Sequence, residues 1–309
     1  MESISLNAYA KINFALDVIE RLPDGFHRVD MIMHLIELHD KVLVRWFPGG
    51  NDFTIELKTN KYFLPVDSRN IAYKAAEIMH EKYMPNVNGT VRIDIKKEIP
   101  VAAGLAGGSG NGAAVLLGLN HLWGLDLSLK DLCEVGKELG SDVPFSMVGQ
   151  AKVNKKLGDK FNNDPLATVC ARAEGKGTEL TPLPSIKSNI LLSKPPINVS
   201  TAEVYKGLDV NNIDNHPDIS AMAQGIKEGD NHVVRNNMIN VLERYTTKVY
   251  PQVKDTMKIM RGNAVNGQIL MSGSGPTVFS AFMGTKELDA QYEKMKKINE
   301  ETVRTRTLV

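Results

Sequence analysis

The stretch Pro100–Ala114, PVAAGLAGGSGNGAA, has almost no bulky side chain and carries five glycines, namely Gly104, Gly107, Gly108, Gly110 and Gly112. It lies between a β-rich segment, TVRIDIKKEIP, and a strong helix pattern, AVLLGLNHLW. Glycine lets a ligand approach the backbone closely, and a glycine loop that opens a helix directs free N–H groups and the positive dipole end at one point. A tight turn needs only one or two glycines. The stretch therefore predicts an anion site, most often a phosphate site.

Two common nucleotide-binding motifs fit this loop poorly. A Walker A loop needs a lysine directly after its last glycine, and none follows here. Gly108, Gly110 and Ala113 do satisfy G-x-G-x-x-A, but residues 100–107 separate them from the strand, where a dinucleotide fold has a tight turn. The acid expected about 20 residues further on, Asp131, falls inside a helix pattern. Dinucleotide binding is therefore the weaker alternative.

Several polar residues in and beyond the loop admit two interpretations. Ser109 can contact a phosphate oxygen or Mg²⁺, or it can cap the helix, and Asn111 is equally a cap or a ligand. Asp142 in GSDVPF can accept the proton of an attacking hydroxyl, although alone it is more simply a helix N-cap. Lys11 in AYAKINFAL faces solvent or pairs with an anion such as Asp142 or a phosphate. The turn Ser272–Thr277, SGSGPT, is a tight hairpin or a segment that closes over a ligand.

Composition places the chain among ordinary globular enzymes. Its 309 residues are 42% hydrophobic and 24% charged, which suits one large domain or two ordinary ones. A net charge of +1 and the lack of a basic patch interleaved with aromatics argue against nucleic acid and membrane partners. Cys133 and Cys170 are too few for a metal cluster or a disulfide framework. No signal peptide and no run of about 18 apolar residues is found, so we expect a cytoplasmic protein.

Local patterns predict an α+β chain. Alternating apolar residues predict strands within 3–21, 31–38, 41–47, 52–59, 89–100, 167–184, 189–196, 267–282 and 302–309. Helical periodicity predicts helices within 67–84, 114–123, 124–139, 201–208, 216–262 and 286–301. Asp67 or Ser68 is expected to cap the first helix, and Ser128 with Asp131 resembles a capping box. Residues 158–165 read as an exposed loop. A linker near 181–189 suggests two layered domains, 1–187 and 188–309.

Four segments follow one another along the chain, and their order is informative: AKINFALDV, PVAAGLAGGSGNGAA, GSDVPF and LMSGSGPTVF. Together they resemble the GHMP kinase superfamily, which includes galactokinase, homoserine kinase and mevalonate kinase. RLPDGFHRVD, DSRNIAYKAA, EGKGTELTPLP and KPPINVSTAEVY are most similar to those members whose acceptor is a cytidine-diphosphate-linked methylerythritol. The resemblance implies an N-terminal domain like ribosomal protein S5 domain 2, a ferredoxin-like C-terminal domain, and ATP bound in the cleft between them.

The same resemblance implies an ATP-dependent small-molecule kinase that uses Mg²⁺ and phosphorylates the acceptor's 2-hydroxyl in the non-mevalonate route to isoprenoids. Lys11 and Asp142 match the family's catalytic lysine and its proposed general base, the lysine holding the carboxylate ionised. The acceptor side is matched by Asn13, Phe26, His27 and Ser274, with a ring that stacks on cytosine and a histidine that hydrogen-bonds it. The nucleotide side is matched by Asn70, Lys97, Pro100, Ala102, Ala103, Gly104, Leu105, Ala106, Gly107, Gly108, Ser109, Gly110 and Asn111, with Ser109 also as the metal contact.

Two departures from the family pattern stand out. The family loop usually reads G-G-S-S-[D/N]-A-A, whereas this chain has Gly110 and Gly112 at the second serine and at an alanine. We therefore expect a more mobile loop with one hydroxyl contact fewer, because glycine in a helix costs about 1 kcal/mol against alanine. Residues 152–165 form an apparent insertion. The alternatives are another GHMP-type kinase, for mevalonate, homoserine or a sugar, and a weakly active nucleotide-binding homologue. The chain is expected to be a monomer or a homodimer.

Overall fold

The computed structural model describes residues 2–262 and 264–309. The contacts among its residues form two compact units. Unit 1 comprises residues 1–10, 38–99 and 106–169, and unit 2 comprises residues 11–37, 100–105 and 170–309. The long strands β1 (Glu2–Arg21) and β2 (His27–Pro48) each contribute to both units. The proposed division of the chain at residue 187 stays a prediction.

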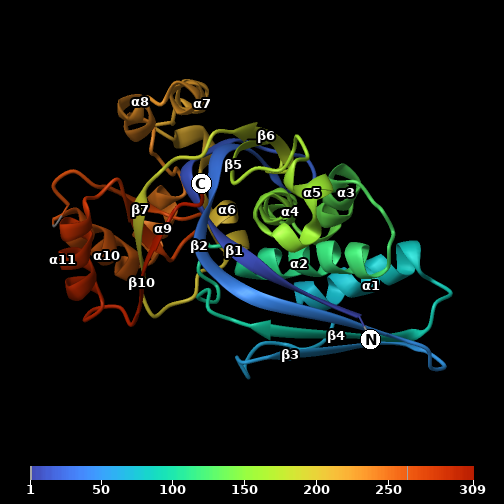
Figure 1. Cartoon of the computed structure of the whole chain (residues 1–309). Helices are drawn as coiled ribbons and strands as arrows, with labels where there is room; N and C mark the ends of the chain where they lie inside the picture. The colour runs from blue at the N-terminus through green and yellow to red at the C-terminus, as the bar shows by residue number, and fades with distance from the viewer. Residues whose placement is uncertain (1, 263) are drawn as a thin grey trace. The chain divides into compact units, whose positions relative to one another are not determined.

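Unit 1 is a sheet covered by helices. The second half of β2 pairs antiparallel with β4 (Gly89–Lys96), and β4 pairs parallel with β3 (Phe53–Thr59). Alternate residues of β4, from Val91 to Ile95, point into the core, as the period of a strand requires. Figure 1 shows the helices gathered over this sheet. They are α1 (Ile71–Tyr83), α2 (Gly107–Leu122), α3 (Leu129–Leu139) and α4 (Asp142–Val153).

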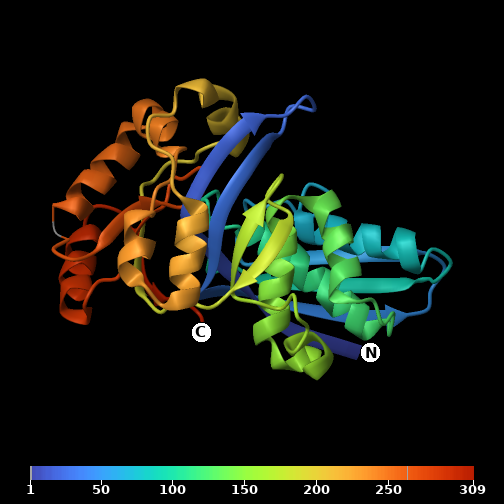
Figure 2. The same cartoon turned by 90° about the horizontal axis from the view of Figure 1, so that it is seen from above.

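Unit 2 contains a four-stranded antiparallel sheet in the order β10-β7-β9-β8. Together with its helices it follows a β-α-β-β-α-β order, which is the ferredoxin-like pattern. Figure 2 shows α10 and α11 against this sheet. The first half of β2 pairs with β5, and β5 with β6, in the same unit. The bounds are β5 (Cys170–Glu174), β6 (Glu179–Leu183), β7 (Asn189–Lys194), α6 (Thr201–Gly207), η2 (Val210–Asn212), α7 (Ile219–Glu228), α8 (Asn231–Asn236), α9 (Glu243–Val249), α10 (Pro251–Arg261), β8 (Gln268–Met271), β9 (Val278–Ala281), α11 (Thr285–Met295) and β10 (Glu301–Arg306).

The α+β class with two sheets and a ferredoxin-like C-terminal part is confirmed. The start of α2 differs from the sequence expectation, because the helix begins at Gly107, inside the glycine stretch. Packing outweighs glycine's weak helix propensity there. A Cβ at Gly112 would lie 2.6 Å from Cγ2 of Ile71, and one at Gly118 would lie 3.2 Å from Val44. The glycines therefore let α2 approach α1 and β2 closely.

Two further local expectations are corrected. Asn70, rather than Asp67 or Ser68, caps α1, because its Oδ1 accepts from the Ala72 N–H at 3.0 Å while Asp67 binds Arg69. The expected loop 158–165 instead holds the short helix α5 (Asp159–Asn162), which follows the 3₁₀ turn η1 (Lys155–Leu157). The capping box of Ser128 and Asp131 is confirmed.

Among residues 2–262 and 264–309, no helix combines the length and the apolar character needed to cross a membrane.

Candidate active site

The N-terminus of α2 in unit 1 lies in the glycine stretch, for which the sequence predicts a phosphate site. The helix is entered through Ala106 in the left-handed region at φ 56°, and no side chain caps it. The Gly110 N–H donates to the Ala106 carbonyl at 2.8 Å, so the N–H groups of residues 107–109 precede the first helical hydrogen bond. Ser109 is the third residue of the helix rather than its cap. Backbone donors, a helix dipole and one hydroxyl thus meet at this end.

A buried charged network fixes the first turns of α2. Asp40, which is fully buried, forms an ion pair with Lys97, and its Oδ2 accepts from the Asn111 amide at 2.9 Å. Its Oδ1 accepts from the backbone N–H groups of Glu98 at 2.7 Å and Ile99 at 2.9 Å. Lys97 also donates to Asn111 at 3.1 Å. The polar atoms of Lys97 and Asn111 therefore bind one another and Asp40. These contacts hold the segment before α2 against the second turn of the helix.

The close approach of this network explains one glycine. A Cβ at Gly107 would lie 3.0 Å from Nζ of Lys97, so a side chain would press on the buried cation. Asp40 itself escaped sequence reasoning. Its only signal is its place in the strand segment LIELHDKVLV, which also holds Glu37, and burial of an acid there without a partner would be costly.

Asp142 and Asn70 lie on the other helices of unit 1. Asp142 is the half-buried first residue of α4. α4 packs on α2, and Gln150 donates to the Gly110 carbonyl at 2.8 Å. Asn70 uses its amide oxygen for the cap of α1 and its amide nitrogen for the Pro65 carbonyl at 2.9 Å. Asn70 therefore shapes the entrance of α1.

Lys11 and Asn13 form a buried pair on β1 in unit 2. The Lys11 ammonium, with its residue 4% exposed, donates to Oδ1 of Asn13 at 2.7 Å. The Lys11 backbone N–H donates to the Leu105 carbonyl at 3.1 Å, so β1 is tied to the first part of the glycine stretch. The solvent-facing interpretation of Lys11 is wrong. A buried cation of this kind favours a negatively charged or polarised partner.

The turn Ser272–Thr277 meets these residues within unit 2. The Ser272 hydroxyl donates to the Gly104 carbonyl at 2.9 Å, and a Cβ at Gly104 would lie only 2.3 Å from the Ser272 carbonyl oxygen. A Cβ at Gly273 would lie 3.4 Å from Nζ of Lys11. The Ser274 hydroxyl is within 2.9 Å of the Thr201 hydroxyl. The turn is a hairpin between β8 and β9, and it also packs against the lysine that the sequence assigned to catalysis.

Phe26 and His27, which the sequence predicts on the acceptor side, lie in unit 2. Phe26 is 59% exposed, and the Lys176 ammonium lies 4.7 Å from its ring centroid. The His27 ring lies 5.2 Å from the ring of Tyr205 on α6. Partial burial, with a smaller contribution from Arg21, lowers the pKa of His27, which favours the neutral imidazole. Tyr205 was missed by sequence reasoning, although it ends the KPPINVSTAEVY segment. An exposed phenylalanine ring next in sequence to a neutral histidine suits a flat heteroaromatic ligand.

The chain is similar to known proteins over nearly its whole length. The family model "GHMP kinases N terminal domain" matches residues 70–150. A 4-diphosphocytidyl-2-C-methyl-D-erythritol kinase from Alkaliphilus oremlandii is 43% identical, over 96% of this chain and 93% of its own length. The corresponding kinase from Clostridioides difficile is 40% identical, over 97% and 96%.

The chain is also similar to solved structures. The chain is similar to a crystal structure of 4-(cytidine 5′-diphospho)-2C-methyl-D-erythritol kinase, with a TM-score of 0.76 and 26% identity, over 98% of this chain and 99% of that chain. It shares its fold with homoserine kinase from Cytophaga hutchinsonii, with a TM-score of 0.69 and 17% identity, over 100% and 95%.

Proposed function

The chain belongs to the 4-diphosphocytidyl-2-C-methyl-D-erythritol kinases, a family of GHMP kinases, and from this we propose that it transfers the γ-phosphoryl group of ATP to that cytidyl alcohol. It is an ATP-dependent small-molecule kinase of isoprenoid biosynthesis. The observation that carries this function is identity of about 40% over nearly the whole length of several such kinases. Phosphorylation at the 2-hydroxyl, a cytoplasmic location, a monomeric or dimeric state and the absence of nucleic acid partners stay predictions.

The end of α2 is the proposed site for the ATP phosphates. Its first N–H groups and dipole are preorganised to stabilise negative charge on the phosphates as the transfer proceeds. Gly108 is exposed and the neighbouring Gly107 and Ser109 are half-buried, so a phosphate can approach the backbone directly. The Asp40 network keeps this turn in one geometry before ATP binds.

Mg²⁺ is proposed as the companion of ATP. Mg²⁺ prefers oxygen ligands and usually keeps several waters, with few protein ligands besides the substrate phosphates. The donors here fit that habit. The Ser109 hydroxyl is available on the first turn of α2, and the described residues include no group of three His, Cys, Asp or Glu side chains that could hold a metal. Ser109 would hold the ion, which neutralises phosphate charge when bound.

Asp142 is the proposed general base, and Lys11 the proposed cation of the transfer. The acceptor hydroxyl would give its proton to the Asp142 carboxylate while its oxygen forms the new bond to the γ-phosphorus. The bond between that phosphorus and the β–γ bridging oxygen breaks, and ADP leaves with the electron pair. Lys11, positioned by Asn13, would orient the reacting groups and offset their negative charge. Phe26, His27 and Tyr205 would bind the cytosine ring by stacking and hydrogen bonding.

An acceptor panel tests the function. Purified protein is assayed for ATP consumption with 4-diphosphocytidyl-2-C-methyl-D-erythritol, mevalonate, homoserine and galactose. We expect turnover with the cytidyl alcohol alone. Faster turnover with mevalonate, homoserine or galactose would assign the chain to a different GHMP activity. ATP binding without turnover of any acceptor would make it a nucleotide-binding homologue.

A further inference from the structure

Residues 239–243 connect two parts of unit 2 that carry predicted site residues. The Leu16 N–H of β1 donates to the Ile239 carbonyl at 2.9 Å, and the Val241 N–H donates back to the Leu16 carbonyl at 3.0 Å. Asn240, between them, is 3% exposed. This short bridge ties its backbone to the strand that carries Lys11.

The Asn240 side chain reaches to the other part, the end of β8 and the turn that follows. Its amide nitrogen donates to the Met271 and Gly273 carbonyls, each at 2.8 Å. Its amide oxygen accepts from the Leu242 N–H at 3.0 Å. One buried amide therefore satisfies three backbone groups and locks residues 271–273 to the 239–243 segment.

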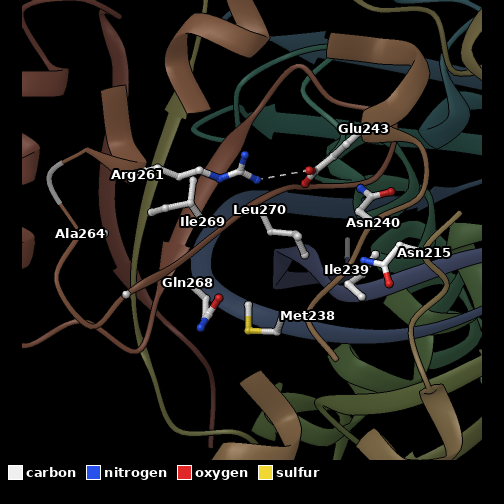
Figure 3. A pocket seen from close by; sticks show the side chains of 11 residues that line it. Asn215, Met238, Ile239, Asn240, Glu243, Arg261, Ala264, Gln268, Ile269 and Leu270 are labelled. Carbon is white, nitrogen blue, oxygen red and sulfur yellow. Dashed lines mark ion pairs between the residues drawn. The ribbon is translucent and has the colours of Figure 1, made fainter. Parts of the chain in front are cut away.

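Glu243, the first residue of α9, adds a second hold on the same backbone. Its Oε1 accepts from the Met271 N–H at 2.8 Å, and its Oε2 lies 3.6 Å from the Arg261 guanidinium. Figure 3 shows Glu243 and Asn240 on the wall of a cavity of about 400 Å³, with Arg261 reaching toward Glu243. Two side chains of one segment, Asn240 and Glu243, therefore hydrogen-bond the backbone of Met271.

The backbone that these two side chains hold is next to the candidate catalytic residues. Ser272 donates to the Gly104 carbonyl, and Gly273 approaches Nζ of Lys11 so closely that a Cβ would lie 3.4 Å away. A shift of residues 271–273 would therefore move the surface that Lys11 and Asn13 pack against. An error of about 1 Å in such a position can lower a catalytic rate by about 100-fold.

We propose that Asn240 and Glu243 are positioning residues for phosphoryl transfer, which act by holding the Met271–Gly273 backbone against Lys11 and Gly104. The inference rests on the proposed kinase function. Neither side chain needs to touch a substrate. The effect is expected in kcat, because the clamp sets the geometry of groups that act during transfer, whereas ATP phosphates are assigned to α2 of unit 1.

The test compares Asn240→Ala, Glu243→Ala and Glu243→Gln with Gln291→Ala. Gln291 is the matched control, because its buried amide likewise donates to a backbone carbonyl, that of Met260 at 2.9 Å, and anchors α11 rather than the turn. Steady-state kcat and the KM for ATP are measured for each variant together with its thermal midpoint. Glutamine at 243 keeps an acceptor for the Met271 N–H, so it is the conservative variant.

We expect Asn240→Ala and Glu243→Ala to lower kcat by roughly 10- to 100-fold with the KM for ATP changed less than about two-fold. Glu243→Gln should stay within about three-fold of the wild type, and Gln291→Ala should lose thermal stability without losing kcat. Equal kcat in Gln291→Ala and both alanine variants would overturn the proposal, as would a loss in Glu243→Gln equal to that in Glu243→Ala. If Asn240→Ala does not fold, the two Glu243 variants decide.

The wild type separates this inference from the proposed function. It is assayed first on the cytidyl alcohol, and failure there contradicts the function without reference to any variant. If another acceptor proves active, the same variants are compared on that acceptor, where the expected split between kcat and KM is unchanged.

Discussion

The start of α2 in unit 1 and the turn Ser272–Thr277 in unit 2 are both glycine-rich, but they are anchored by opposite chemistry. The start of α2 is held by the buried ion pair of Asp40 and Lys97, in which each charge compensates the other. The turn is held by the neutral amide of Asn240 and by Glu243, whose pKa burial raises to about 7. Glycine content alone therefore says little about how rigidly a loop is held.

The two kinds of anchor predict different losses of stability on mutation. Removing one partner of a buried ion pair leaves an uncompensated charge in the core, whereas removing a neutral hydrogen-bonding group leaves an unpaired amide at a smaller cost. We expect unit 1 to be sensitive to mutation at its ion pair. Burial raises the pKa of Glu243 to about 7, so this anchor of unit 2 should be more sensitive to pH.

The largest effect is expected at Asp40. Asp40→Ala leaves the buried Lys97 without its carboxylate and should lower the free energy of unfolding by about 3–5 kcal/mol, measured by urea denaturation. The matched control is Glu138→Ala, which breaks the exposed Lys82–Glu138 pair of the same unit and should cost about 0–1 kcal/mol. Asp40→Ala combined with Lys97→Met should recover part of the loss. A double variant as unstable as the single one would show that the charge is not the cause.

His34 provides the next effect, in unit 2. This fully buried ring lies 2.8 Å from the Leu35 carbonyl through Nδ1 and accepts from the Ile186 N–H at 2.9 Å through Nε2, and burial lowers its pKa from 6.5 to about 4. The unfolded chain binds the proton first, so stability is complete above pH 6.5 and falls as pH drops toward 4.

The expected contribution of His34 is about 3 kcal/mol of unfolding free energy lost between pH 7 and pH 4. Urea denaturation across this range should show a shallower pH dependence for His34→Gln than for the wild type. His232→Gln, at an exposed histidine, should keep the wild-type slope. Identical slopes for His34→Gln and the wild type would show that His34 does not contribute to the pH dependence of stability.

Glu243 should titrate in the opposite sense. Its folded pKa of about 7 exceeds its ordinary value of 4.5, so its contribution to stability is present below pH 4.5 and is lost as pH rises through 7. Glu243→Gln should therefore be more stable than the wild type by roughly 1–3 kcal/mol at pH 8. The two proteins should be nearly equal at pH 4.5. A glutamine variant without a gain at pH 8 would contradict the claim that burial raises the pKa of this anchor.

The smallest effect concerns Gly112. Alanine would gain about 1 kcal/mol in helix propensity, but its Cβ would lie 2.6 Å from Ile71, and overpacking costs about 1–3 kcal/mol. Gly112→Ala should therefore be less stable than the wild type by about 1 kcal/mol. Gly108→Ala, whose Cβ meets Ile71 at an ordinary 3.5 Å, should not be destabilised by overpacking. A Gly112→Ala variant more stable than the wild type would contradict the packing explanation and would support the expectation that this glycine makes the loop more mobile.

Local patterns in the sequence predict most of the fold. The features that they do not predict depend on contacts between residues far apart in the chain. The strands and the capping box of Ser128 follow from nearest neighbours along the chain. The helix start at Gly107 does not, because packing against Ile71 outweighs propensity.

The same limit applies to the candidate site. Motifs identify Lys11 and the glycine stretch, but they do not show that Lys11 is buried and donates to Asn13. Asp40 and Tyr205 were missed because each gains its meaning from a residue far along the chain, Lys97 and His27 respectively. An acid in a strand and an aromatic residue in a helix carry no signal of those contacts.

The central claim is that this chain moves the γ-phosphoryl group of ATP to 4-diphosphocytidyl-2-C-methyl-D-erythritol with Asp142 as the base. Single-turnover transfer of label from γ-labelled ATP measures it directly, with wild-type protein and with Asp142→Asn. The account predicts labelled cytidyl product from the wild type and a rate lowered by roughly 10²- to 10⁴-fold in Asp142→Asn, with ATP binding retained. Transfer by Asp142→Asn at the wild-type rate, or wild-type label that never reaches the cytidyl alcohol, would contradict it.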